Sequence, residues 1–284
     1  EEGKVVLGTD LTGKMAVVTG AGGILCGMFA RTLARAGAAV ALLDINLEAA
    51  EETARDIREA GGTATAYGVD VMDKEMLESV HARVLARLGP CDILINGAGG
   101  NQARANTSKE YFEMGDIEAD VATFFDMEYK GVQGVLDLNF LGGFLTCQVF
   151  AKDMVGREGC NIINISSASA ARPLTRIPVY SGAVAALSNF TQWLAVHFAK
   201  AGIRVNAIAP GFFVTRQNEG LLYEEDGKPA ARTAKVLAAT PMGRFGRPEE
   251  LNGALMFLLN NEAAGFITGI ILPVDGGFSA YSGV

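Results

Sequence analysis

The chain has 284 residues, of which 49% are hydrophobic, and its 24 basic and 32 acidic residues give a net charge of −8. This apolar fraction supports a sizeable core, and the acidic balance argues against a nucleic-acid-binding protein, whose affinity needs clustered Lys and Arg. Four scattered cysteines and two histidines argue against a disulfide scaffold or a His/Cys metal site, so no metal is expected. The first residues lack the apolar core of a signal peptide, and no run of 18 apolar residues is free of charge. We therefore expect a cytoplasmic protein without a membrane-spanning helix.

Short apolar runs alternate with amphipathic stretches along the chain. The runs predicted as strands cover residues 15–18, 40–43, 64–68, 93–95, 161–165, 205–208 and 270–274. Helical patterns lie between them, for example at 47–60, 74–88 and 248–260. Apolar runs without polar alternation are typical of strands buried on both faces of a parallel sheet. The alternation predicts an α/β fold, a doubly wound sheet with helices on both faces, and residues 1–284 are expected to form one domain.

Two connections are much longer than the usual loop of two to six residues. Residues 97–134 and 212–246 each leave the carboxyl end of a predicted strand, where open α/β sheets bind ligands. We interpret an insert at 100–130 and a substrate loop at 212–246 as functional segments, with surface decoration as the alternative. The acidic part of the insert, residues 110–128, is expected to be a solvated face, and a lid is the alternative.

A glycine-rich turn, TGAGGILCG at residues 19–27, follows the first predicted strand and opens a helix. Gly20, Gly22 and Gly23 would let a pyrophosphate approach the backbone, where the helix start at Ile24 and Leu25 offers free N–H groups. Asp44 ends the second strand at the distance where an acid should meet the adenosine ribose. Residues 20–27 contain no Lys or Arg for a 2′-phosphate, so NAD is favoured over NADP. A solvated strand-end acid is the alternative for Asp44.

Several further motifs follow in a fixed order. They are Asp70-Val71, Asn96-Gly97-Ala98-Gly99, Asn139, the NISS sequence at 164–167, Tyr180, Pro210-Gly211 with Thr215, and VDGG at 274–277. With the turn at 19–27, these motifs make the chain resemble the short-chain dehydrogenase/reductase family over residues 9–284. The resemblance implies a Rossmann-type sheet of seven strands in the order 3-2-1-4-5-6-7, and a homodimer or homotetramer.

The resemblance also implies which residues bind the cofactor. Asp70 and Val71 would lie beside the adenine, residues 96–99 would line the cofactor, and Phe213 and Thr215, after Pro210 and Gly211, would face the nicotinamide. The turn departs from the family pattern TGxxxGxG, because Ile24 and Cys26 occupy two glycine positions. A neighbouring glycine is expected to allow the same close approach. A reactive thiol at the helix start is the less favoured interpretation of Cys26.

Reduction of a carbonyl by hydride needs a proton donor beside the oxygen and a second group that holds it. By the resemblance, Tyr180 is the acid/base and Ser167, thirteen residues earlier, orients the substrate oxygen. Asn139 would hold a water and bend its helix near the site. The alternative is that Ser167 caps a strand end and Tyr180 merely begins a helix.

The family motif at the tyrosine is YxxxK, whose lysine holds the nicotinamide ribose and lowers the pKa of the tyrosine. This chain has Val184 at the lysine position and contains no other YxxxK. An ordinary tyrosine titrates near pH 10, so roughly 1 in 1,000 molecules is phenolate at pH 7. Reduction, which needs the neutral hydroxyl, is therefore expected to survive better than alcohol oxidation, which needs a base.

The segments 173–181, 188–200, 210–218 and 276–284 resemble the D-mannonate oxidoreductase (D-fructuronate reductase) branch of the family. An anionic sugar acid needs local positive charge, which Arg176, Arg172, Arg104 and Arg216 would supply, while Gln217 would meet sugar hydroxyls. We predict an NAD-dependent reductase of a sugar acid that binds neither nucleic acid nor membranes. The alternative is a catalytically impaired NAD(H)-binding protein, because of Val184. The apolar helices near 135–155 and 183–200 suit either a subunit interface or the core.

Overall fold

The computed structural model describes residues 8–214, 222 and 229–283. Its centre is a seven-stranded sheet in the order β3-β2-β1-β4-β5-β6-β7, and every pair of neighbouring strands is parallel. The strands are β1 Met15–Thr19, β2 Ala39–Asp44, β3 Thr63–Gly68, β4 Ile93–Asn96, β5 Cys160–Ile165, β6 Ile203–Pro210 and β7 Ile271–Val274. The predicted sheet and strand order are thus confirmed.

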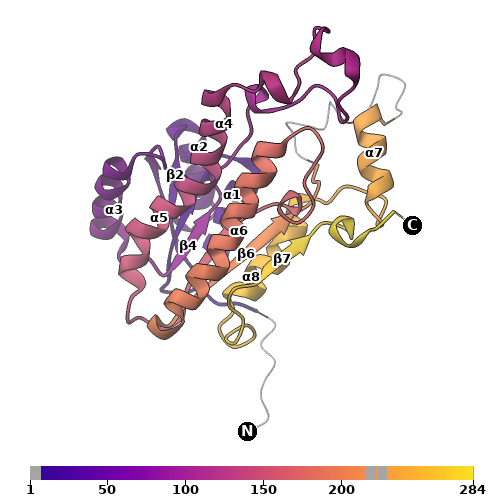
Figure 1. The fold of residues 1–284 in the computed structure, drawn as a ribbon. Helices are drawn as coiled ribbons and strands as arrows, with labels where there is room; N and C mark the ends of the chain where they lie inside the picture. The colour runs from indigo at the N-terminus through magenta and orange to yellow at the C-terminus, as the bar shows by residue number, and fades with distance from the viewer. Residues whose placement is uncertain (1–7, 215–221, 223–228, 284) are drawn as a thin grey trace.

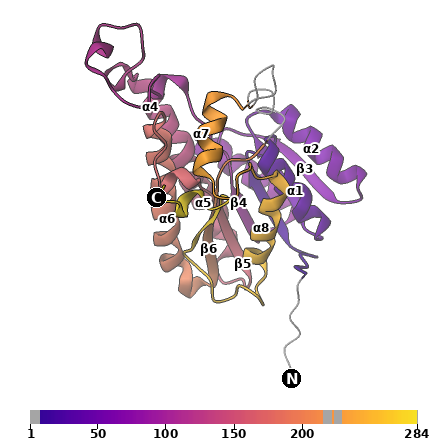
Figure 2. The same cartoon turned by 90° about the vertical axis from the view of Figure 1, so that its right-hand side faces the viewer.

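Helices cover both faces of this sheet (Figures 1 and 2). They are α1 Ile24–Arg35, α2 Leu47–Glu59, α3 Lys74–Leu88, α4 Tyr129–Leu136, α5 Gly142–Phe150, α6 Pro178–Phe198, α7 Ala231–Ala239 and α8 Asn252–Leu259. The helix predicted at 248–260 begins with a 3-10 turn, Pro248–Leu251, before α8. The single helical run from Tyr129 to Phe150 contains a π-helical turn, Asp137–Leu141, between α4 and α5.

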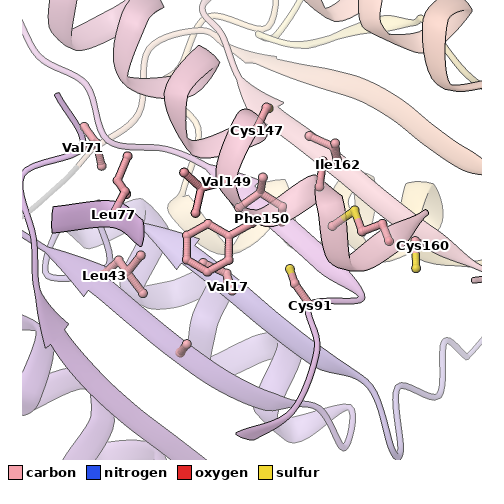
Figure 3. Close-up of a cluster of buried hydrophobic side chains, with 14 of the residues drawn as sticks. Val17, Leu43, Val71, Leu77, Cys91, Cys147, Val149, Phe150, Cys160 and Ile162 are labelled. Carbon is pink, nitrogen blue, oxygen red and sulfur yellow. The ribbon is translucent and has the colours of Figure 1, made fainter. Parts of the chain in front are cut away.

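The two core layers use alternate residues of the same strands, because successive side chains of a strand point to opposite faces. On one face, Val17 and Leu43 pack with Leu77 of α3 and Phe150 of α5 (Figure 3). On the other face, residues such as Val18 pack with α1 and α8. The sheet is therefore buried on both sides, as its uninterrupted apolar runs predict.

One stretch, Tyr129–Met154, is long and apolar enough to cross a membrane, with a mean hydropathy of 1.3. Lys130 and Asp137 interrupt its apolar run. In the fold, α5 of this stretch packs against β4 and α3, while α4 packs against α6. These contacts bury 44% of the most apolar window of the stretch. Its high hydropathy is therefore consistent with a helical layer packed on the sheet.

Candidate active site

The turn after β1 needs glycine at its first position. Gly20 adopts a left-handed φ of 68°, and a Cβ there would lie 2.9 Å from the carbonyl oxygen of Gly97. The Gly23 N–H donates to the Gly20 carbonyl at 2.9 Å and closes the turn. A side chain at residue 20 would therefore strain the backbone and push the loop after β4 away.

Asp44 holds the next part of the turn. Its Oδ2 accepts from the Gly22 N–H at 2.9 Å, and its Oδ1 accepts from the Asn46 N–H at 2.8 Å. A Cβ on Gly22 would lie 2.8 Å from the Cβ of Ala49, so glycine is required here for close packing against α2. The carboxylate is thus fixed at the carboxyl end of β2, where the sequence places a ribose-binding acid.

Helix α1 begins at Ile24 with Gly23 as its N-cap, and no side chain caps it. The first N–H groups of a helix have no partner within the helix and attract anions. Ile24 and Leu25, both half-buried, thus present N–H groups beside the turn. This uncapped helix start, its two close-packed glycines and Asp44 fit the pyrophosphate and ribose of a dinucleotide.

Cys26 occupies a position where the family has glycine, and the structure shows why the turn tolerates it. A Cβ on Gly97 would lie 2.1 Å from the Cys26 Sγ, so the sulfur fills the space above Gly97. Burial raises the pKa of the Cys26 thiol to about 12, and the nearby Asp44 charge adds to this rise. The thiol therefore stays protonated and fills space in the core, which argues against a reactive cysteine. Nothing in the sequence pairs residue 26 with residue 97.

The loop after β4 is held from two sides. The Thr19 Oγ1 accepts the N–H groups of Gly97 and Ala98 at 3.0 and 3.1 Å. On the other side, the Asn139 Oδ1 accepts from the Gly100 N–H at 3.0 Å, and its Nδ2 donates to the Gly100 carbonyl at 2.7 Å. Asn139 lies in the π-helical turn, so the distortion expected of its helix is present. Sequence reasoning gave Thr19 no role, although its place at the end of β1 was the available signal.

The side chain of Asn96 is buried between the sheet and helix α5, beside Cys147. Its Nδ2 donates to the Asn164 Oδ1 at 2.8 Å, and the Asn164 Nδ2 donates to the Thr191 Oγ1 at 2.8 Å. All three residues are buried. In the segment 96–99, the part available to a cofactor is thus the backbone after Asn96.

Ser167 and Tyr180 meet at the carboxyl edge of the sheet. Ser167 follows β5, while Tyr180 lies in the first turn of α6, and the Ser167 side chain is close enough to the Tyr180 phenol to influence its pKa. Ser167 Oγ accepts from the N–H and the hydroxyl of Ser169, at 3.2 and 3.0 Å. Burial raises the pKa of Tyr180, and the Ser167 side chain opposes part of this rise. The pair can hold an oxygen atom and give it a proton.

Val184 lies one helical turn after Tyr180 and is 2% exposed. Its carbonyl accepts from the Ser188 Oγ at 2.9 Å and from the Ser166 Oγ at 3.3 Å. Among the described residues, no Lys or Arg contributes to the pKa shift of Tyr180. The described part of the chain therefore supplies no substitute for the positive charge of the family's lysine.

The arginines expected near the pocket are held by backbone groups. The Arg176 Nε donates to the Thr107 carbonyl at 3.2 Å, and the Thr107 N–H donates to the Arg176 carbonyl at 3.0 Å. Arg172 donates to the Tyr281 carbonyl. The segment before α6 is thus joined to the insert on one side and to the C-terminal tail on the other.

The Arg104 Nη1 lies 3.5 Å from the Glu128 Oε2, so this arginine forms an ion pair within the insert. The other predicted residues of this region, Thr215, Arg216 and Gln217, lie outside the described residues.

The remaining candidates lie at strand ends with their side chains already engaged. The Asp70 Oδ1 accepts from the Met72 N–H at 2.9 Å, and Val71 is buried against Gly142. Phe213 is buried in the core layer under α8, where its ring occupies the space beside Gly246. Its backbone, and not its ring, is therefore what this residue can offer a cofactor. After Pro210, the last residue of β6, the Gly211 N–H donates to the Val274 carbonyl at 3.0 Å.

This parallel strand order, with an uncapped helix start after β1 and a Ser–Tyr pair at one edge, is typical of Rossmann-type oxidoreductases. The profile of a protein family described as enoyl-(acyl carrier protein) reductase matches residues 23–279. The chain is 54% identical to an uncharacterized oxidoreductase of Haemophilus influenzae (strain ATCC 51907 / DSM 11121 / KW20 / Rd), over 97% of this chain and 96% of the relative. It is 49% identical to an uncharacterized oxidoreductase of Bacillus subtilis (strain 168), over 99% and 100% of the two chains.

A crystal structure from Haemophilus influenzae superposes with a TM-score of 0.95 at 53% identity, covering 99% of this chain and 100% of the other. That protein carries the provisional name D-mannonate oxidoreductase and holds bound NAD. The chain therefore belongs to the short-chain dehydrogenase/reductase family of oxidoreductases.

Proposed function

We propose that the protein is an NAD(H)-dependent reductase of a keto sugar acid, converting D-fructuronate to D-mannonate. The observation that carries the proposal is the Ser167–Tyr180 pair, in which burial raises the pKa of the tyrosine so that it stays protonated. The NAD bound to the Haemophilus relative and its provisional name support the cofactor and the substrate. Asp44 supports NAD over NADP, because a 2′-phosphate beside its carboxylate would be repelled.

Bound NADH supplies the hydride that reduces the substrate carbonyl. In this mechanism, Ser167 donates a hydrogen bond to the carbonyl oxygen and Tyr180 transfers its phenolic proton to the same oxygen. Thr19 and Asn139 fix the loop 97–100 beside this position. Asp44 and the N–H groups of Ile24 and Leu25 would hold the cofactor.

Arg176 is the proposed carboxylate ligand of the substrate. Its Nε is tied to Thr107, which fixes the plane of the guanidinium and leaves its Nη1 and Nη2 groups for an end-on carboxylate. Its side chain is exposed, four residues before Tyr180. Arg172 and Gln217 are proposed as further substrate ligands.

The direction of the pKa shift determines how the rate depends on pH. Reduction needs neutral Tyr180, so its rate stays constant as pH rises and falls when pH passes the raised pKa. Oxidation of the alcohol needs the phenolate, so its rate rises with pH through the same point. A lysine at residue 184 would lower this pKa and shift both profiles toward neutral pH.

The test is NADH oxidation with D-fructuronate, and NAD reduction with D-mannonate, from pH 6 to 10. We expect reduction across this range, and a Val184→Lys variant that oxidises D-mannonate about tenfold or more faster at pH 7 than the parent. Val184→Met is the matched control, because it adds a long side chain without charge. If the lysine variant folds and binds NADH but is no faster than the methionine variant, the assignment of Val184 is wrong.

Val184 also favours a second candidate function, a catalytically impaired NAD(H)-binding protein. It is buried, and the described residues place no cation beside Tyr180. Tight NADH binding without turnover of D-fructuronate at any pH, with turnover appearing in Val184→Lys, would select this candidate. NADH binding without turnover in either chain would instead contradict the proposed substrate.

We also propose that the chain is a single domain over residues 1–284 and forms a cytoplasmic homodimer or homotetramer through α4, α5 and α6. Supporting this, α6 has 21 residues and contains no Asp, Glu, Lys or Arg. Its outer side exposes Trp193 and Val196, which are 56% and 79% accessible. Subunit interfaces are depleted of charge and enriched in aromatic residues at their centre.

A further inference from the structure

The insert carries the densest group of exposed apolar side chains on the described surface. We call residues 108–128 the arm; it stands beyond α4, away from the sheet, on the side of α4 and α6 (Figures 1 and 2). Between half and nine-tenths of each of six large apolar side chains is accessible: Tyr111, Phe112, Met114, Ile117, Phe124 and Phe125. Apolar side chains grouped in this way mark interaction sites on soluble proteins.

The arm holds these side chains in a fixed arrangement. The Lys109 Nζ contacts the carboxylates of Asp116 at 2.6 Å and Glu113 at 2.7 Å, and Asp116 is buried. The rings of Phe112 and Phe124 each pack edge-on against Phe125, with centroids 5.9 and 5.6 Å apart. A surface ordered before binding loses little conformational entropy when it binds, so it is suited to a partner.

The charge of the arm narrows the class of partner. Residues 108–128 contain seven acidic side chains and one lysine. Nucleic acids and the anionic surfaces of membranes would be repelled. A second arm would be repelled as well, so the partner surface must be apolar and free of acidic residues.

Area and position indicate where this surface lies. The four exposed aromatic side chains of the arm present on the order of 500 Å² of accessible surface. A stable interface buries roughly 800 Å² on each partner, so the arm can form only part of a larger interface. The hydrogen bonds between Thr107 and Arg176 place the arm at the N-terminal end of α6. A two-fold axis perpendicular to α6 would lay two α6 helices antiparallel and bring this end beside the C-terminal end of the other. Trp193 and Val196 lie in the C-terminal half of α6, which contains no acidic residue.

We propose that the arm of one subunit packs on Trp193 and Val196 of α6 in a second copy of the chain. The contact extends the proposed α4–α6 interface and therefore depends on self-association. Each α6 spans about 31 Å, so the two arms of a dimer lie at opposite ends of the helix pair. The repulsion between the acidic arms is thereby avoided.

The chain offers a direct test, because Trp193 is its single tryptophan and its four cysteines are buried. A nitroxide spin label, which quenches tryptophan fluorescence at short range, is attached to a Met114→Cys, Trp193→Phe double variant. This variant has no tryptophan, so after mixing with unlabelled wild-type chain any quenching of Trp193 is intermolecular. The control carries the label at Phe266→Cys, also with Trp193→Phe, because Phe266 is fully exposed and lies outside the arm.

We expect the label at residue 114 to quench Trp193 and the label at residue 266 to leave it unchanged. In sedimentation equilibrium, Phe124→Asp/Phe125→Asp should raise the dissociation constant of the dimer about tenfold or more, whereas Phe266→Asp should not. A dimer without quenching from residue 114 would overturn the proposal. Equal quenching from both labels, or a monomer at high concentration, would overturn it too.

Discussion

The proposed site has a nucleotide end, formed by residues 20–25 and Asp44, and a chemical end, formed by Ser167 and Tyr180. Both lie at the carboxyl edge of the sheet, yet they depart from the family pattern in different ways. At the nucleotide end, two glycine positions are changed to Ile24 and Cys26, but the turn still closes and Asp44 still holds Gly22. At the chemical end, Ser167 and Tyr180 keep their contact, but the charge that belongs at residue 184 is absent.

The difference shows that the two ends depend on different properties. Phosphate binding uses backbone N–H groups and needs close approach to the backbone. The Cys26 side chain takes up space that a glycine would leave empty, and the absence of a side chain at Gly97 makes room for it. Lowering the pKa of the tyrosine depends on a positive charge nearby, and packing cannot replace that charge. Substitutions at the first end are therefore expected to change affinity or stability, and those at the second to change rate and pH dependence.

The largest effect is expected at Tyr180. Tyr180→Phe removes the proton donor, so kcat for reduction should fall on the order of 10²–10⁴-fold, with the Kd for NADH unchanged in a fluorescence titration. Tyr67→Phe is the control, because this tyrosine is buried and its hydroxyl has no hydrogen-bond partner in the described structure. A Tyr180→Phe enzyme as active as the control would show that the proton comes from elsewhere.

The next effect is expected at Arg176. Arg176→Gln should raise KM for D-fructuronate about tenfold to a hundredfold, because it removes a charged hydrogen-bond partner of the carboxylate. KM for a neutral ketose should change little. Arg58→Gln serves as control, since it removes an exposed arginine paired with Glu51 within α2. An equal rise for the acid and the neutral ketose would reject Arg176 as the carboxylate ligand.

A smaller effect is expected where Cys26 meets Gly97. Gly97→Ala overpacks this contact and should lower the free energy of unfolding by about 1–3 kcal/mol in urea denaturation, with weaker NADH binding. Cys26→Gly combined with Gly97→Ala should recover much of this loss, because the Sγ is removed. If the two substitutions change the free energy of unfolding additively, the side chains at residues 26 and 97 do not compete for the same space.

The smallest effect is expected at Asp44. Asp44→Asn weakens the contact with the Gly22 N–H and with the ribose, so the Kd for NADH should rise about tenfold and discrimination against NADPH should decrease. Asp56→Asn is the control, because Asp56 is an exposed acid paired with Arg31. Unchanged selectivity between the two cofactors would leave Asp44 a structural residue of the turn.

Much of the fold followed from local sequence signals. The strands lie within two residues of their predicted ends, and α3 has the predicted bounds 74–88, because buried strands and amphipathic helices are recorded in the spacing of apolar residues. The separation of Ser167 and Tyr180 likewise predicted that the two residues lie close together, as they do in the structure, while their catalytic role stays a prediction. The side-chain directions of Asn96 and Phe213 did not follow, since the family motif fixes a position but not what lies around it.

The sequence by itself determined three features of this protein. The family motifs implied the strand order, Asp44 was recognised as the acid at the end of β2, and Val184 showed that the family's lysine is missing. The tertiary structure alone decided that Cys26 fits because residue 97 is glycine, that Arg176 is anchored by Thr107, and that the aromatic side chains of the arm stand in solvent. The physical reason is distance along the chain. Periodicity and motif spacing report local conformation, whereas these three facts depend on steric fit and exposure between segments that only the folded chain brings together.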